Sequence, residues 1–390
     1  MLSKKLPALK NKIKFKTKIE KKLPNLINGY DKNLQKYLTE IEKFSISEWD
    51  LYRDLCNDYE FIGINKNQIE KLKKLTKVEI ITILKFKPLT RAYFKLWEIL
   101  HNFEFIPKNI SCTNVCLMSS NLAEAPGGWI NAIIDYEKKY NPNQLSKHKL
   151  IGISLKSSLK FNLKEHNYLK KFNQQIEINY GLGDGDLTNP KNILEYAKRF
   201  KNNKAHIVTA DGGIGGDNYN DKEYLNSKLI FGEIIAALMV QKIDGNFVLK
   251  TYSLYTNLSI QLLNILQNYY QEVYITKPVT SRPANDELYL VCLKFKGINT
   301  AESNELIKIL TTWNNLKSNQ YLVSILESNQ TIKEISNFNK KYTKIQIENL
   351  KKILNSQNMT QKEMKLQIDK MYKNAKDWYQ KYNIKSNYNI

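Results

Sequence analysis

Short apolar runs alternate with helical patterns through the middle of this chain, and this alternation limits the possible folds more than any other feature. Helical patterns occupy 189–200, 221–242 and 257–269. Strands that alternate with helices form βαβ units, so we expect an α/β fold with a mainly parallel sheet. The last two runs have little between them, which suits an antiparallel pair at one edge. The runs are TNVCLMSSNL, KLIGISL, QQIEINYG, AHIVTAD, GNFVLKTYSL, EVYITKP and ELYLVCLKF.

The regions that flank this alternation have a different composition. Residues 1–24 carry nine lysines and one glutamate, with Leu, Ile and Phe between them. This pattern fits a solvated tail, an RNA-contacting arm or an amphipathic surface helix. Apolar positions three and four residues apart predict helices elsewhere in the flanks. We therefore expect a basic amino-terminal arm (1–24), a helical amino-terminal region (25–84), a central domain (85–297) and a helical carboxyl-terminal extension (298–390).

The charge balance favours a polyanionic partner. The chain has 60 Lys and Arg against 38 Asp and Glu, a net charge of +22. An AT-rich genome also raises the lysine content, but this excess is larger than that bias requires. Nucleic acid is the polyanion that such a protein most commonly binds.

The cysteines and the apolar stretches exclude several classes of protein. The chain has four cysteines, too few for a disulfide scaffold, and Cys112 and Cys116 have no second pair at zinc spacing. No metal site is therefore expected. The amino terminus lacks the apolar core of a signal peptide, and the stretch LIFGEIIAALMV is interrupted by Glu233. The sequence predicts a cytoplasmic protein that is neither secreted nor bound to a membrane.

Glycine-rich turns follow three of the expected strands, where open α/β sheets bind their ligands. They are EAPGGW at 124–129, GDGDLTNP at 183–190 and ADGG at 210–213. Neither the phosphate-loop pattern nor the dinucleotide pattern of glycines is present. The carboxylates of Asp184 and Asp186 can accept hydrogen bonds from a ribose or an exocyclic amine. Each turn taken alone also fits a tight surface turn without a ligand.

Charged residues mark the same edge of the expected sheet. Lys250 interrupts a strand that otherwise looks buried, and it either extends to solvent at the strand end or has a function. Glu287 opens the last strand behind a Ser-Arg-Pro turn, and Lys95 lies in an amphipathic helix upstream of the sheet. The order of the strands allows these residues and Asp211 to meet at one edge.

This combination resembles the FtsJ/RrmJ-like family of S-adenosylmethionine-dependent RNA 2′-O-ribose methyltransferases, over roughly 85–295. It is most similar to the cap-1 mRNA methyltransferases of eukaryotes and large DNA viruses. The resemblance implies a Rossmann-like class I methyltransferase sheet, mostly parallel with its last strand antiparallel, between helical extensions. The runs that carry it are YGLGDGDLTNPKNI, ADGG…LNSKL…FVLKTYSLYT and ITKPVTSRPANDELYLVCLKFKG.

The resemblance also implies roles for individual residues. The catalytic tetrad of the family corresponds to Lys95, Asp211, Lys250 and Glu287. The S-adenosylmethionine contacts correspond to Ala125, Pro126, Gly127, Gly128, Trp129, Asp184, Asp186, Leu187 and Asp211. The RNA contacts correspond to Arg91, Asp221, Lys222, Glu223, Ser281, Arg282 and Asn285. Two positions depart from the family: Ser154 stands where many members have an acid, and Glu124 where small residues are usual.

The chemistry explains the need for two amines and two carboxylates. A ribose 2′-hydroxyl is a poor acid and must lose its proton as it attacks a sulfonium methyl group. Lys250 is the expected base, and the positive charges of Lys95 and the sulfonium are expected to lower its pKa. Asp211 and Glu287 would orient the lysines. The Asn/Asp-Pro-Pro-aromatic motif of exocyclic-amine methyltransferases is absent, which favours an oxygen acceptor.

The expected substrate is the first transcribed nucleotide of capped mRNA, so the expected partners are RNA and other capping or transcription subunits. The similarity to viral members suggests a large DNA virus, which would place the protein in the host cytoplasm or in the virion. Two alternatives stay open: the same reaction on ribosomal or transfer RNA, and a non-catalytic RNA-binding subunit that keeps the fold.

Overall fold

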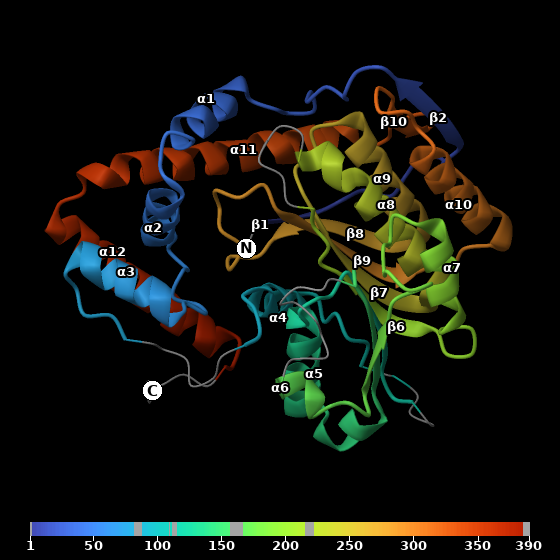
Figure 1. Cartoon of the computed structure of the whole chain (residues 1–390), viewed down its shortest axis with the longest axis horizontal. Helices are drawn as coiled ribbons and strands as arrows, with labels where there is room; N and C mark the ends of the chain where they lie inside the picture. The colour runs from blue at the N-terminus through green and yellow to red at the C-terminus, as the bar shows by residue number, and fades with distance from the viewer. Residues whose placement is uncertain are drawn as a thin grey trace.

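A mixed sheet of eight strands forms the centre of the part of the chain that the structure describes (Figure 1). The structure is a computed structural model that describes residues 2–81, 88–108, 110, 115–156, 167–214 and 222–384. The strand order is β1-β8-β9-β7-β6-β3-β4-β5. The strands are β1 (Leu2–Lys5), β3 (Met118–Leu122), β4 (Lys149–Ile153), β5 (Ile176–Asn179), β6 (Ala205–Ala210), β7 (Gln241–Thr251), β8 (Tyr270–Lys277) and β9 (Leu288–Phe295).

The strand directions confirm the expected Rossmann-like methyltransferase fold. β5, β4, β3, β6 and β7 pair in parallel, and β9 pairs antiparallel with both β7 and β8. The expected antiparallel pair is therefore β8 and β9. It does not end the sheet, because β9 lies between β7 and β8, and β1 covers the outer side of β8. The position of β9 agrees with the burial of Tyr289 (0% exposed) and Leu290 (2% exposed).

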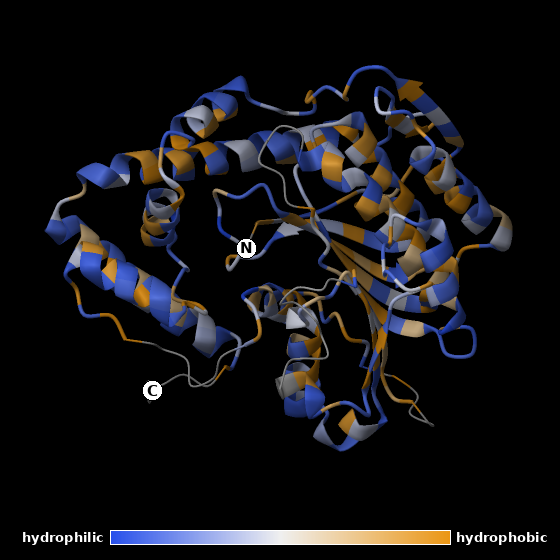
Figure 2. Cartoon of the chain, viewed as in Figure 1, coloured by the Kyte–Doolittle hydropathy of each residue, from blue (hydrophilic) through white to orange (hydrophobic). Residues whose placement is uncertain are grey.

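Helices cover both faces of the sheet. One face packs against α7 (Pro190–Lys198), α8 (Lys222–Val240), α9 (Asn257–Tyr269) and α10 (Thr300–Asn314), and the other against α4 (Ala92–Asn102) and α5 (Gly128–Tyr140). Alternate residues of a strand face opposite sides, so Phe247 and Leu249 enter the first core and Val248 the second. Figure 2 shows hydrophobic positions, in orange, along the central strands. The short helix α6 (Asn167–Lys170) precedes β5.

The amino-terminal segment forms paired strands rather than a free solvated tail or an amphipathic surface helix, and contact of its lysines with RNA stays a prediction. Residues 2–5 form β1, which pairs antiparallel with β8, and β2 (Phe15–Glu20) pairs with β10 (Tyr321–Leu326). Leu6 is buried, at 5% exposure. The physical reason is that the open edge of β8 has unpaired backbone groups that a further strand satisfies. The carboxyl-terminal extension is likewise not entirely helical, since β10 belongs to it.

Helices from the two ends of the chain pack together into one body, which we call the helical lobe. It consists of α1 (Lys32–Ile41), α2 (Ile46–Cys56), α3 (Lys66–Thr76), α11 (Ile332–Asn355) and α12 (Gln361–Lys381), seen on the left of Figure 1. Reciprocal side-chain and backbone bonds between Ser45 and Glu48 cap α2, and the same arrangement between Asn65 and Gln68 caps α3.

None of the helices in the described ranges combines the length and the apolar surface that a bilayer-spanning segment needs.

Candidate active site

The ends of four structural elements meet at one edge of the sheet. Asp211 directly follows β6, and Lys250 lies near the end of the neighbouring β7. Glu287 precedes β9, which runs the opposite way, so its start lies beside the end of β7, where Leu288 pairs with Thr251. Helix α4 brings Lys95 to the same place. The sheet order thus brings together all four residues of the expected tetrad.

The four side chains form two ion pairs. The Lys250 Nζ lies 3.1 Å from Asp211 Oδ1 and donates a hydrogen bond of 2.7 Å to the Asp211 carbonyl oxygen. The Lys95 Nζ lies 2.8 Å from Glu287 Oε1 and 3.0 Å from Oε2. These side chains are only partly accessible, between 13% for Lys250 and 20% for Asp211. The site therefore offers two amines and two carboxylates with limited contact to water.

The electrostatics of Lys250 are opposite to the sequence-based expectation. Burial lowers the pKa of Lys250, but the negative charge of Asp211, together with Tyr252 and Glu287, outweighs burial and raises it. The expectation gave too little weight to the Asp211 carboxylate, which lies 3.1 Å from the Lys250 amine and stabilises its charged form. Burial would raise the pKa of Glu287, yet the ammonium groups of Lys95 and Lys250 hold it well below its usual range. Within the protein alone, the charged forms of Lys250 and Glu287 are therefore favoured.

A third lysine at this edge was missed by the sequence analysis. Lys277, at the end of β8, donates hydrogen bonds to the hydroxyl of Ser281 (3.1 Å) and to the carbonyl oxygens of Asn285 (3.1 Å) and Glu287 (2.7 Å). Burial lowers its pKa to about 7. The signal was present, because Lys277 ends an apolar strand run in YITKP just as Lys250 ends one in FVLK.

The turn after β3 is held by Glu124, one of the two departures from the family. Its Oε1 accepts hydrogen bonds from the backbone N–H groups of Trp129 (2.8 Å) and Ile130 (2.9 Å), so it caps the start of α5. Its other oxygen is buried without a partner, and burial raises the pKa of Glu124 to about 8. The second departure, Ser154, accepts a hydrogen bond from the Ala125 N–H (3.2 Å) and joins this turn to the end of β4.

The residues around this edge fit an adenosine ligand with a positive centre. Leu155 and Leu182, at the ends of β4 and β5, are each 63% exposed and offer apolar surface to a base. Asp211 Oδ1 is buried and accepts no well-aligned hydrogen bond, although it is paired with Lys250. A side chain on Gly213 would approach the Tyr252 hydroxyl oxygen to 2.3 Å, so the glycine allows Tyr252 and Lys250 to pack closely against this turn. These features fit S-adenosylmethionine.

The structure places the side chains of the expected cofactor contacts in different surroundings, and their contacts with the cofactor stay a prediction. The Trp129 side chain is 1% exposed and donates its indole N–H to the Ala92 carbonyl oxygen, so the ring belongs to the core. The Leu187 side chain is also buried. The Asp184 carboxylate binds the Asp186 N–H within the turn itself. The segment Ala125–Gly128 and Asp186 stay at the edge as candidate backbone and side-chain contacts.

The expected RNA contacts other than the two arginines differ in how exposed their side chains are. Glu223 and Ser281 are buried: Glu223 accepts hydrogen bonds from the backbone at Tyr255 and Thr256, and Ser281 donates to Glu287 Oε1. Their side chains therefore hold the fold rather than face a ligand. Lys222 is 27% exposed beside Asp286. Asn285 is half-buried, whereas Asp221 lies outside the described residues.

The two expected RNA-contacting arginines are engaged inside the protein. Arg282 and Arg91 both pair with Glu60, at 2.7 Å and 3.0 Å, and Glu60 is fully buried. Their side chains are 18% and 23% exposed, which leaves little guanidinium surface for a phosphate.

The described residues contain no group of three or more His, Cys, Asp or Glu side chains that could hold a metal ion.

The strand order and the paired lysines and acids at its edge define the class I methyltransferase fold. The family model of FtsJ-like methyltransferases matches residues 88–295, which is more than half of the chain. The chain therefore belongs to the FtsJ-like methyltransferase family.

Similar proteins come from a virus and from vertebrates. The chain is 32% identical over 215 residues to a protein named probable methyltransferase EP424R of African swine fever virus, covering 52% of this chain and 48% of the relative. It is 29% identical over 254 residues to the human cap-specific mRNA (nucleoside-2′-O-)-methyltransferase 1, covering 61% of this chain and 29% of the relative. The chain thus spans less than half the length of these relatives.

A solved structure of a ribosomal RNA methyltransferase, putative, from Plasmodium falciparum is also similar. It is 23% identical and covers 54% of this chain and 99% of its own, with a TM-score of 0.38. A likeness of this size does not bear on function.

Proposed function

We propose that this protein transfers a methyl group from S-adenosylmethionine to a ribose 2′-hydroxyl of RNA. The observation that supports this most is the pairing of Lys95 with Glu287 and of Lys250 with Asp211 at the carboxyl edge of the sheet. The cluster is polar, shielded from bulk water and adjacent to a turn suited to an adenosine ligand. Such a site can orient a hydroxyl group and accept its proton.

The reaction is an in-line displacement, which depends above all on positioning. When bound, S-adenosylmethionine supplies an activated methyl group. Lys250 is the base for the hydroxyl proton, and Asp211 holds the amine in place through a contact of 3.1 Å. Glu287 holds Lys95 in the same way. Because the carboxylates raise the pKa of Lys250, the neutral amine is the minor form near pH 7, and we expect the rate to rise with pH.

The substrate that we propose is the first transcribed nucleotide of capped mRNA. The human relative is named a cap-specific mRNA (nucleoside-2′-O-)-methyltransferase, which supports this choice. The net charge of +22 supports an RNA partner. We further propose that the protein works in the host cytoplasm or the virion of a large DNA virus, beside other capping or transcription subunits, and the viral relative supports this proposal.

The decisive experiment compares methyl transfer to matched short RNAs with and without a cap. We expect transfer to the first nucleotide of the capped RNA only. Equal transfer to both RNAs, or transfer only to structured ribosomal or transfer RNA, would displace the cap-1 proposal but keep the chemistry. Failure to bind S-adenosylmethionine in a calorimetric titration would contradict the enzymatic function itself and favour a non-catalytic RNA-binding subunit.

A further inference from the structure

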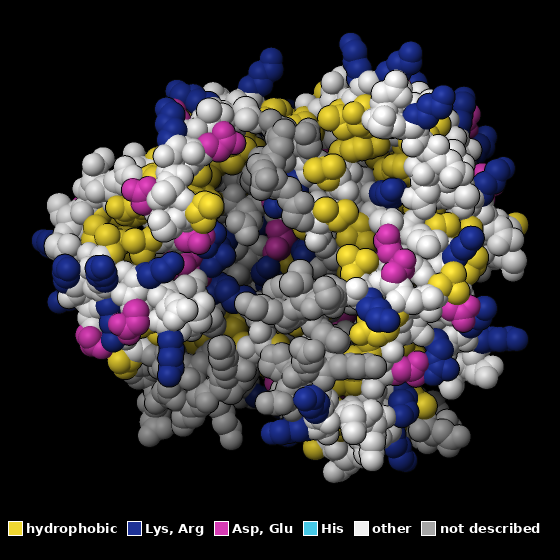
Figure 3. Space-filling view, viewed as in Figure 1, with side chains coloured by type: hydrophobic (Ala, Val, Ile, Leu, Met, Phe, Trp, Pro, Cys, Tyr) yellow, Lys and Arg dark blue, Asp and Glu magenta, His cyan; other side chains and the backbone are white. Residues whose placement is uncertain are grey.

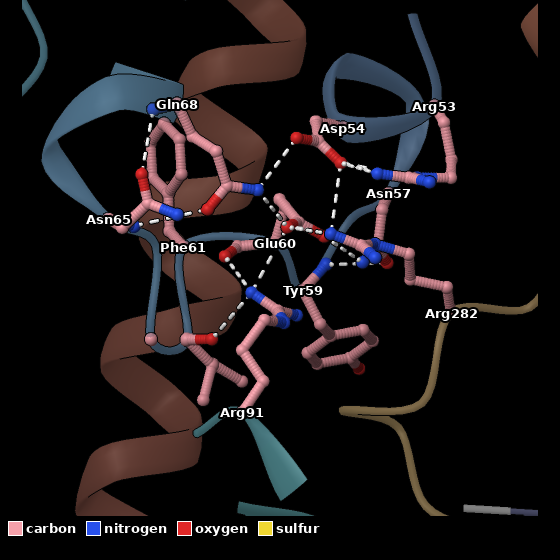
Figure 4. A network of polar contacts seen from close by, with 12 residues as sticks. Arg53, Asp54, Asn57, Tyr59, Glu60, Phe61, Asn65, Gln68, Arg91 and Arg282 are labelled. Carbon is pink, nitrogen blue, oxygen red and sulfur yellow. Dashed lines mark hydrogen bonds and ion pairs between the residues drawn. The ribbon is translucent and has the colours of Figure 1, made fainter. Parts of the chain in front are cut away.

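The loop between α2 and α3 places a buried carboxylate at the boundary between the helical lobe and the sheet. Glu60 is 0% exposed, and its two oxygens accept hydrogen bonds from Arg282 Nη2 (2.7 Å) and Nε (3.0 Å). Arg91 Nη1 lies 3.0 Å from the same carboxylate. Figure 4 shows both guanidinium groups directed at Glu60, one from α4 and one from the loop before β9. We call this cluster the Glu60 network.

Further bonds fix the Glu60 carboxylate in its orientation. The side-chain amide of Asn57 donates to Oε2 (2.7 Å), and that of Gln68 donates to Oε1 (3.0 Å). Asp54 Oδ1 accepts a second bond from Arg282, at 3.0 Å. Arg91 also donates to the Glu60 carbonyl oxygen, at 3.1 Å. A carboxylate with this many donors occupies a single position, so the two guanidinium groups are fixed as well.

Both arginines are close in sequence to the catalytic cluster. Arg91 is the cap residue of α4, and Lys95 follows one helical turn later. Arg282 follows Ser281, whose hydroxyl donates to Glu287 Oε1 at 2.9 Å. Each member of the pair formed by Lys95 and Glu287 is thus carried by a segment that Glu60 holds. A shift of either segment, the one around Arg91 or the one around Arg282, would change the 2.8 Å distance between Lys95 Nζ and Glu287 Oε1.

We propose that Glu60 is a positioning residue for methyl transfer, which sets the geometry of the Lys95–Glu287 pair through Arg91 and Arg282. This proposal rests on the proposed function. It assigns a catalytic contribution to the helical lobe, because Glu60 lies outside the matched family region of 88–295. The lobe then acts as a support for the active site, and the two arginines act inside the protein rather than on the RNA.

The test replaces Glu60 with glutamine, which keeps the size of the side chain and removes its charge. Positioning errors reduce the rate at saturation, so we expect kcat to fall about 10- to 100-fold. The KM values for S-adenosylmethionine and RNA should change by less than about threefold, since Glu60 touches neither substrate. Arg282→Lys keeps the charge but loses the bidentate contact with Glu60, so we expect a smaller fall in kcat. This variant replaces Glu60→Gln in the test if Glu60→Gln does not fold.

Asp58→Asn is the matched control. Asp58 lies in the same loop and pairs with Lys352 (2.9 Å) and Lys370 (2.7 Å), and its polar contacts among the described residues stay within the helical lobe. Its loss should lower the thermal midpoint and leave kcat within about twofold. A fall in kcat that is equal in both variants and follows the loss of stability would overturn the proposal, as would full activity of Glu60→Gln.

Coupling to the active site is measured by adding Glu287→Gln. If Glu60 acts through Glu287, the double variant should be no slower than Glu287→Gln alone. Independent, multiplying losses would contradict the proposal. A readout without RNA keeps this test separate from the proposed function. In protein with ¹³C-dimethylated lysines, the NMR signal of Lys95 is assigned by its loss in Lys95→Arg. We expect this signal to shift in Glu60→Gln and to stay in place in Asp58→Asn. An unmoved signal would refute the positioning role even if the wild type proved inactive.

Discussion

Lys277 is buried and Lys250 is largely buried at the ends of their strands, yet their amines have opposite electrostatic surroundings. Lys250 lies 3.1 Å from a carboxylate oxygen of Asp211, which raises its pKa against the effect of burial. Lys277 is bound only by neutral oxygens at short range, so burial dominates and lowers its pKa to about 7. Partners distant in sequence decide the difference, which explains why sequence reasoning gave Lys250 the wrong direction.

Replacement of Lys250 should separate catalysis from cofactor binding. We expect Lys250→Ala to lower methyl transfer at least about 1,000-fold, because the variant loses the base. Its affinity for S-adenosylmethionine, measured by calorimetry, should stay within about threefold of the wild type. Lys242→Ala, at the exposed start of the same strand, is the control and should keep full activity. Loss of cofactor affinity in Lys250→Ala would show that its role is binding.

Lys277 should make the stability of the fold depend on pH. Its pKa is about 7 in the folded protein and near 10.5 in the unfolded chain, so between these values the unfolded chain binds the extra proton. The free energy of unfolding should therefore rise with pH, by at most about 1.4 kcal/mol per unit. Below pH 7 both states are protonated and this contribution is constant. Denaturant titrations from pH 7 to 10 should show a flatter dependence for Lys277→Met, but an unchanged one for Lys242→Met.

At the scale of elements, sequence reasoning succeeded where the signal is local. Helix α9 has the expected bounds of 257–269, because Thr256 caps it through the Ser259 N–H and apolar residues repeat along it. The strands of the sheet domain were found from their apolar runs. β1 and β2 were missed because they are short and rich in lysine, and each pairs with a strand roughly 300 residues away.

The amino-terminal strands change the experiment that tests RNA binding by this segment. Deleting residues 1–24 would also remove two paired strands and the buried Leu6, so it would confuse binding with folding. Replacing the exposed Lys12, Lys16, Lys21 and Lys22 with glutamine avoids this. If these lysines contact phosphates, the slope of log affinity against log salt should fall by about 0.7 per lost contact on single-stranded RNA.

The control for that experiment is a set of four exposed lysines on the helical lobe: Lys362, Lys365, Lys373 and Lys376. Their replacement should leave the slope unchanged. An unchanged slope in the amino-terminal variant as well would mean that its lysines are only solvated.

At the scale of the whole molecule, the catalytic cluster could be predicted, but its support could not. A polar cluster at the strand ends follows from the sheet order, and all four tetrad residues meet there. Arg91 and Arg282 looked like phosphate ligands because they lie near that cluster in a basic chain. Their true partner, Glu60, comes from a separate lobe, and no local pattern connects the three. Figure 3 shows the surface hollowed between the lobe and the sheet, with charged side chains in the hollow.

The pairing of β1 with β8 has a consequence for how the chain folds during synthesis. Leu2 is made before its partner Lys277, which follows 275 residues later (277 − 2). Contacts between such distant residues form slowly. β1 must therefore wait for β8 before it can pair, and until then both β1 and the outer side of β8 remain open to wrong partners. Pulse-labelling hydrogen exchange should show late protection at the backbone amides of Lys4 and Leu6, which face β8.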